Sequence, residues 1–171
     1  MKSLLPKVLC LLLLTSVGCT QRRIKRLSDD EYTHYSALRV WMTEEEQAAF
    51  LKRKLEEDRN AYLQELGLWE RFYQYSERER ALIIEGEVEL GWTKDKVLMA
   101  WGRPHDSQKL VGRQARRSER LIYRFELHEG GRVLVWDANS NTDYQAQRLF
   151  QRDLILDDDV VVDIVLKRSW D

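Results

Sequence analysis

Residues 91–104 read Gly-Trp-Thr-Lys-Asp-Lys-Val-Leu-Met-Ala-Trp-Gly-Arg-Pro, and this stretch carries the signals of a short helix with a defined start and end. Thr93 is a residue type preferred at a helix N-cap, so the helix is expected over 94–101. Gly102 is expected to end the helix, and Pro104 prevents it from resuming. The apolar side expected to face a core comprises Val97, Leu98 and Trp101.

Downstream of this helix, the apolar residues change from helical spacing to alternation. Residues 105–118 are polar and basic and are predicted to form a loop. Because the connections between the following segments are short, we predict an antiparallel meander of three to four strands, with one polar face and one face packed against helices. The expected strands span 121–128, 132–136, 145–156 and 160–166, with turns at Gly130-Gly131, Asn139-Ser140-Asn141 and Asp157-Asp158-Asp159.

Upstream, the sequence predicts helices, so the fold class is α+β. Thr43 and Glu46 have the spacing of a capping box, and Gly67 fits a helix end, which predicts one helix between them. A second helical piece is expected from about 68 to 84. These helices either pack on their own domain or form an arm that binds a partner. The apolar stripe of the first helix comprises Ala48, Leu51, Leu55, Tyr62 and Leu66.

The first eighteen residues have the pattern of a secretory signal peptide. They hold two lysines and no acidic residue, and their apolar run, 8–14, is too short to span a hydrocarbon core of roughly 30 Å. Small residues follow, so cleavage is expected before Cys19.

Cys19 is the one cysteine of the predicted mature chain, since Cys10 leaves with the signal. The segment ending Gly18-Cys19 resembles the lipobox of bacterial lipoproteins. That resemblance implies a Cys19 carrying several acyl chains such as palmitate, and Thr20, in place of Asp, implies an outer-membrane protein that faces the periplasm. Ordinary signal peptidase, cutting at the small-x-small site of Ser16 and Gly18, is the alternative.

Four segments are therefore expected: a signal peptide (1–18), a lipidated tether (19–41), a helical region (42–84) and an α+β domain (85–171). Arg22, Arg23, Lys25 and Arg26 make the tether basic, either to meet anionic headgroups or simply as a solvated linker. The mature chain keeps 26 Lys and Arg residues against 29 Asp and Glu residues, a net charge of −3. This balance argues against nucleic acid, which favours strongly basic domains.

Gly91, Thr93, Val97, Gly102 and Pro104, followed by Tyr123, form a pattern that resembles the BamE family, also called SmpA/OmlA. The resemblance covers about 82–168, and the helical region upstream has no counterpart in that family. It implies a capped helix packed on a small sheet, an envelope setting and a scaffold role in outer-membrane assembly or maintenance. β-Lactamase inhibitor proteins share a related plan of helix and sheet.

Residue types that perform catalysis are scattered along the chain. His34, His105 and His128 lack metal-ligand spacing, no serine lies in a nucleophile-elbow motif, and Asp157-Asp158-Asp159 lacks the spacing of a calcium loop. We therefore expect no metal, no cofactor and no small-molecule substrate. Arg113, Arg116 and Arg117 of the basic loop are candidates for partner binding, with a solvated loop as the alternative.

Three functions follow from these patterns. The first is a non-enzymatic envelope lipoprotein, held on the membrane by its lipid, that binds another envelope protein. The second is an enzyme-inhibitor-like binding module in the periplasm. The third, a cell-wall enzyme, would need a cleft with convergent carboxylates and a histidine.

Overall fold

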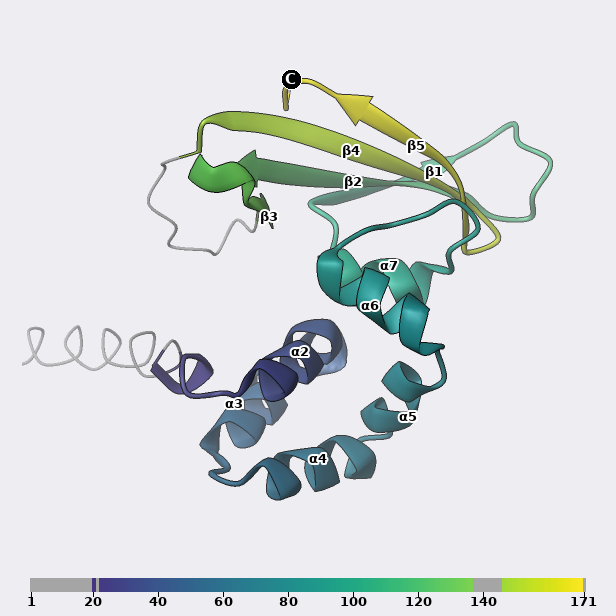
Figure 1. Cartoon of the computed structure of the whole chain (residues 1–171). Helices are drawn as coiled ribbons and strands as arrows, with labels where there is room; N and C mark the ends of the chain where they lie inside the picture. The colour runs from purple at the N-terminus through teal and green to yellow at the C-terminus, as the bar shows by residue number, and fades with distance from the viewer. Residues whose placement is uncertain (1–19, 21, 137–145, 171) are drawn as a thin grey trace, which may run out of the picture. The chain divides into compact units, whose positions relative to one another are not determined.

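The computed structural model of the chain describes residues 20, 22–136 and 146–170 (Figure 1). The expected signal peptide, Cys19 and the expected turn at 139–141 lie outside these residues. The chain divides into two compact units, Met1–Ser76 and Glu77–Asp171, and each is described by itself. Neither unit has, among its described residues, a helix with the length and apolar character needed to cross a membrane.

The first unit is helical. Its elements are α2 (Asp29–Leu38), the 3-10 helix η1 (Arg39–Trp41), α3 (Glu44–Lys52), α4 (Glu56–Glu65) and α5 (Leu68–Tyr73).

Helix α2 occupies part of the segment expected to be a tether, so that expectation is corrected from residue 29 onward. Ser28 and Glu31 form a capping box at its start. Tyr35 and Leu38 are buried, and the ring of Tyr35 stacks on that of Phe50 at 5.5 Å between centroids. Burial of these side chains stabilises α2 as part of the folded unit.

The single helix expected between Thr43 and Gly67 is instead two helices, α3 and α4. The capping box of Thr43 and Glu46 is confirmed, but the chain turns extended at Arg53, whose ψ is 145°. Arg59 donates a hydrogen bond to the Arg53 carbonyl at 2.5 Å, which satisfies a backbone group that the break exposes. Leu51 of the expected stripe is buried, but Ala48 and Leu55 are exposed, and the fully buried residues of α3 and α4 are Phe50 and Leu63.

The second expected helical piece is also divided. It forms α5 in the first unit and α6 (Glu77–Glu85) in the second. The second unit continues with α7 (Lys94–Trp101), β1 (Asp106–Leu110), β2 (Ser118–Leu127), the 3-10 helix η2 (Glu129–Gly131), β3 (Val133–Val135), β4 (Arg148–Asp157) and β5 (Val160–Lys167). The predicted bounds of the helix over 94–101 are confirmed, as is the α+β class.

The sheet has five strands, all paired antiparallel, rather than three to four. The extra strand is β1, which lies in the segment predicted to be a loop and pairs with residues 118–122. The turn at Gly130-Gly131 is confirmed and leads into β3, which pairs with residues 125–127. β1 and β3 thus share one edge of β2, while β4 pairs with the other edge over residues 118–127. The arrangement is therefore not a simple meander.

Helices α6 and α7 lie together beneath one face of this sheet (Figure 1). Leu121, Tyr123 and Phe125 alternate toward that face and are buried, as their spacing predicts. Trp101 of α7 packs edge-on against the rings of Tyr123 and Phe125, each with a centroid distance of 5.0 Å. This aromatic contact joins the helix to the centre of the sheet.

Candidate interaction surface at the edge of the sheet

Gly91, Trp92 and Thr93 lie along the first part of β5 and pair with it. The Gly91 amide donates to the Val161 carbonyl at 2.8 Å, and the Val161 amide donates to the Trp92 carbonyl at 2.8 Å. Thr93 forms a bridge with Val160. Gly91 has a φ of +82°, a conformation that side chains disfavour. Backbone pairing with the sheet edge thus explains the positions of Gly91 and Thr93 in the motif.

Thr93 occupies the N-cap of α7, but its side chain makes no capping hydrogen bond. The expected side-chain cap is therefore corrected. The Lys94 amide instead donates to the Asp159 carbonyl at 2.8 Å, so the turn between β4 and β5 satisfies the start of the helix. At the other end, the prediction that the helix ends at Gly102 is confirmed; its φ is +72° and its ψ is −152°, a conformation that favours glycine but is not the left-handed helical one.

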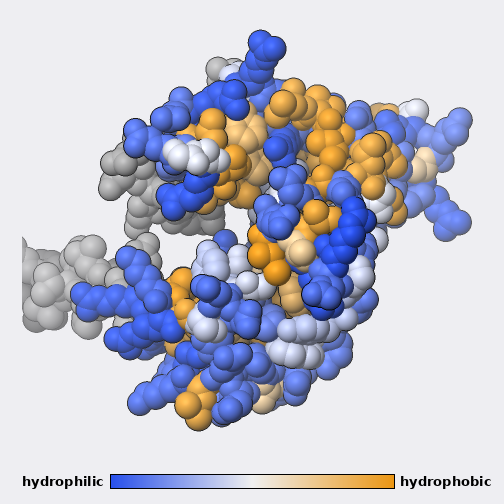
Figure 2. Space-filling view, in the orientation of Figure 1, coloured by the Kyte–Doolittle hydropathy of each residue, from blue (hydrophilic) through white to orange (hydrophobic). Residues whose placement is uncertain are grey.

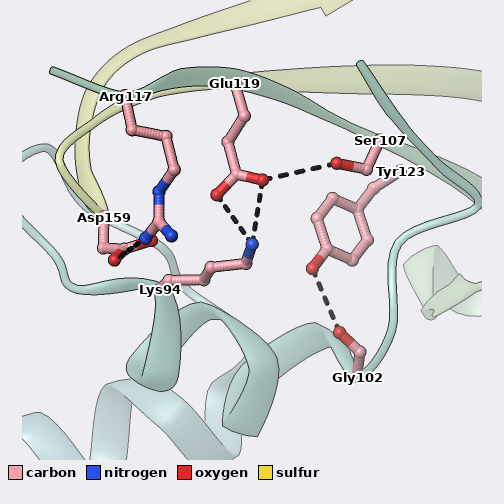
Figure 3. A network of polar contacts seen from close by, with 7 residues as sticks. All are labelled: Lys94, Gly102, Ser107, Arg117, Glu119, Tyr123 and Asp159. Atoms are coloured by element: carbon pink, nitrogen blue, oxygen red, sulfur yellow. Dashed lines mark hydrogen bonds and ion pairs between the residues drawn. The ribbon is translucent and has the colours of Figure 1, made fainter. Parts of the chain in front are cut away.

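Three of the remaining motif residues pack around α7 and its C-terminal end and do not form an exposed site. Val97 and Tyr123 are fully buried, and the Tyr123 hydroxyl donates to the Gly102 carbonyl at 3.0 Å (Figure 3). Burial raises the pKa of Tyr123 above its usual range. Pro104 is half-buried in the connection from α7 to β1. This set ties the end of α7 to β2.

A polar network lies at the start of α7 (Figure 3). The Lys94 ammonium contacts both carboxylate oxygens of Glu119 at 2.6 and 2.9 Å, and the Ser107 hydroxyl donates to Glu119 at 3.4 Å. A lysine in the first turn of a helix is unfavourable for the helix dipole, and Glu119 compensates that charge. No sequence pattern pointed to this pair, because Lys94 and Glu119 are 25 residues apart.

The predicted turn at Asp157–Asp159 is confirmed, and arginines of the basic loop hold it. Asp158 and Asp159 have φ values of +46° and +67°, the signs of a type I′ hairpin turn, which Asp tolerates. Arg113 forms two hydrogen bonds of 2.8 Å with Asp157. Arg117 pairs with Asp159 (Figure 3), and its amide donates to the Asp158 carboxylate at 3.0 Å.

These contacts give two of the three candidate partner-binding arginines a structural role. The Arg113 guanidinium, and then the Ser118 hydroxyl, lower the pKa of Asp157 to about 2. Arg116 is exposed between them. The aspartates of the turn therefore face arginines, and the described residues hold no cluster of three or more His, Cys, Asp or Glu side chains able to bind a metal.

From Val162 onward, past the segment Gly91–Thr93, the outer edge of β5 is open within the part of the chain that the structure describes. Val162, Val165 and Leu166 are 42%, 39% and 65% exposed, and Figure 2 shows hydrophobic side chains gathered in this region of the sheet. The Ile164 amide donates to the Asp163 carboxylate at 2.8 Å rather than to β4. Because amide directions alternate along a strand, the Leu166 amide also points outward.

The face of the sheet opposite α7 carries buried polar side chains in pairs. Asp153 accepts from Gln151 at 2.6 Å and pairs with Lys167 at 2.9 Å. Glu126 and His128 lie 3.0 Å apart. Because each carboxylate has a partner, this face has the character of a structural network, with one polar side as the sequence predicts.

The three histidines have different surroundings. His34 contacts the Tyr73 hydroxyl at 2.8 Å within the first unit, and burial lowers its pKa below 6.5. His105 and His128 belong to the second unit, where His105 lies 5.3 Å from the ring of Trp136.

Comparisons with known protein families, curated proteins and solved structures found no match for this chain.

Proposed function

We propose that this chain is a non-enzymatic cell-envelope lipoprotein, anchored through Cys19 to the outer membrane and facing the periplasm, that binds an extended strand of another envelope protein. Its role would be that of a scaffold in outer-membrane assembly or maintenance, as the resemblance to the BamE family implies. The observation that carries the binding proposal is the open apolar edge of β5.

An open edge strand offers unpaired backbone groups to an incoming strand, and natural proteins usually protect such edges. Here the first part of β5 is covered by Gly91–Thr93, whereas Val162–Lys167 keeps exposed apolar residues on both faces. By register with β4, Leu166 shares the face of Arg152, and Val165 shares the opposite face with Asp153. A bound strand would gain backbone hydrogen bonds from the edge and side-chain contacts on both faces.

The proposed anchor at Cys19 supports the same function. An anchor restricts the protein to one surface, so a modest affinity for a partner on that surface is amplified by high effective concentration. On the face opposite α7, the buried carboxylates of Glu126 and Asp153 each contact a polar side chain, and a carboxylate engaged in this way is less available to a substrate, which favours binding over catalysis there.

Crosslinking from the edge tests the proposal. A photoreactive amino acid at Leu166 in the full chain should capture one or a few envelope proteins in intact cells, identified by mass spectrometry. Placing the same probe at Lys109, an exposed residue of β1, provides the matched control. Capture of a second copy of this chain would instead assign the edge to self-association, and identical products from both positions would contradict the proposal.

The Leu166→Pro variant separates backbone pairing from side-chain contact. Proline removes the outward amide of Leu166, and prolines are tolerated on an edge strand when that amide faces solvent. We expect Leu166→Pro to abolish copurification of the partner. Leu166→Ala keeps the backbone amide and should reduce copurification less. Equal retention of the partner by both variants would contradict binding by strand addition.

The anchor has its own test. Cys19→Ala should release the chain from the membrane fraction or stall its processing, and globomycin should block processing of the parent chain. Unchanged processing and fractionation of the variant would exclude lipidation at Cys19 and leave ordinary signal peptidase as the alternative.

A further inference from the structure

A pocket in the first unit is lined almost entirely by cations. It has a volume of about 430 Å³, and six of its seven lining residues are lysine or arginine. The seventh is Leu51, which is buried. The cations come from three segments: Arg23 and Arg26 precede α2, Lys52, Arg53 and Lys54 end α3 and begin its connection to α4, and Arg59 belongs to α4.

Two of these cations are fixed by the fold. Arg59 is 6% exposed, pairs with Glu31 of α2 and donates to the Arg53 carbonyl. Arg53 donates to the Ala49 carbonyl at 2.6 Å, and its guanidinium lies over the ring of Tyr62 at 3.6 Å. These contacts hold the connection between α3 and α4 against α2, so the pocket wall is built into the unit.

The other four cations bring charge without a matching acid. Among the described residues, no acidic side chain forms an ion pair with Arg23, Arg26, Lys52 or Lys54. Like charges held this close repel one another, and an anion placed among them relieves that repulsion. The set of donors is suited to phosphate oxygens, because arginine presents its donors as a fork and lysine as a compact charge.

We infer that this pocket binds the phosphate of an anionic phospholipid headgroup. Arg23 lies four residues after Cys19 in the sequence, so a lipid anchored at Cys19 would keep the pocket within reach of the membrane surface. The choice of a lipid over a free phosphate rests on the proposed anchor, whereas the anion pocket itself does not.

Isothermal titration tests this inference on the full chain purified in a neutral detergent. The probes are dihexanoyl phosphatidylglycerol, dihexanoyl phosphatidylcholine and inorganic phosphate. We expect phosphatidylglycerol to bind at least about tenfold more tightly than the other two, a preference that salt should reduce. Equal affinity for inorganic phosphate and phosphatidylglycerol would overturn the lipid assignment, and no binding of either anion would overturn the site.

Paired variants separate the pocket from the general charge of the segment. Arg23→Gln/Arg26→Gln removes two lining charges and should weaken phosphatidylglycerol binding by roughly 30-fold, the effect of two charges near a membrane surface. Arg22→Gln/Lys25→Gln removes two exposed charges from the same segment that do not line the pocket, and should change binding by less than about threefold. Equal losses in both variants would show diffuse attraction to anions and overturn the inference.

A second pair approaches the pocket from another element. Lys52→Gln/Lys54→Gln should reproduce the loss seen with Arg23→Gln/Arg26→Gln, and both side chains are exposed, so the helices should keep their melting temperature. Retained binding in this variant would contradict a shared pocket. The mass of each purified protein reports acylation at Cys19 independently, so failure of the anchor proposal and failure of the pocket give different results.

Discussion

Tyr123→Phe measures how far the motif around α7 acts as a scaffold. The change removes one hydroxyl from a fully buried ring and leaves the aromatic packing against Trp101 in place. The lost hydrogen bond to Gly102 is 3.0 Å long. A neutral intramolecular hydrogen bond contributes about 1 kcal/mol net, and an unsatisfied carbonyl adds to this cost when it is buried. Gly102 is only half-buried, so water can replace part of the bond and the cost stays near 1 kcal/mol.

For a domain of this size, about 1 kcal/mol lowers the melting temperature by roughly 4–8 °C. The assay is thermal unfolding of the full chain, followed by calorimetry so that the transitions of the two units are resolved. Tyr32→Phe, at a tyrosine of the other unit that is 52% exposed, is the control and should leave both transitions in place. Capture of the partner by the edge of β5 should survive at temperatures below the transition.

An unchanged melting temperature with loss of the partner would refute the reasoning, because it would make Tyr123 part of the binding site. A fall of more than about 15 °C would refute it differently, since one hydroxyl cannot account for several kcal/mol.

Other expectations concern single contacts. Arg59→Met should lower the free energy of unfolding by about 3 kcal/mol, because Glu31 is left buried without its cation, and the double variant Glu31→Met/Arg59→Met should recover part of that loss. If urea denaturation gave the same loss for both variants, the buried ion pair would not explain it. Arg113→Met should lower the melting temperature of the second unit, whereas Arg116→Met should not. In the Arg113→Met variant, NMR titration should show the pKa of Asp157 rising from about 2 toward 3.8. Because burial lowers the pKa of His34, the unfolded chain takes up that proton first and the first unit should lose stability as the pH falls below 6.5. A His34→Gln variant with the same pH dependence as the parent would argue against this assignment.

The helix over 94–101 and the alternation of Leu121, Tyr123 and Phe125 could be predicted because each depends on local signals. A glycine at positive φ ends the helix wherever the rest of the chain lies, and alternation requires only that one face is buried. The turn at Asp157–Asp159 was predictable for the same reason.

Other elements escaped prediction because their signals are weak or distant. β1 has the sequence Asp-Ser-Gln-Lys-Leu, an edge strand whose exposed residues give no apolar alternation. The break at Arg53 depends on a hydrogen bond that the Arg59 guanidinium donates to the Arg53 carbonyl, and the spacing of apolar residues does not predict such a tertiary contact. The capping box of Ser28 and Glu31 was visible in the sequence and marks α2, but its helix lacks a clear apolar stripe.

The same difference between local signals and distant contacts decides which candidate sites could be predicted. The motif residues of α7 could be recognised as residues that start and end a helix. Arg23 and Arg26 of the cationic pocket lay in a basic cluster visible in the sequence, whereas no sequence pattern brought them together with the lysines and arginines about 30 residues later. The open edge of β5 is equally hidden, since a strand on an edge and a strand in the interior share the same apolar residues.

The pairing of Gly91–Thr93 with the first residues of β5 sets a limit on what the rest of the edge accepts. The remaining stretch, Val162–Lys167, has six residues, which at about 3.4 Å each is roughly 20 Å of strand. An incoming strand that continued past Val162 would meet Gly91, which already occupies the edge beside Val161. The covered start of β5 therefore limits the length of an added strand, and the point at which that strand must end fixes its register on β5.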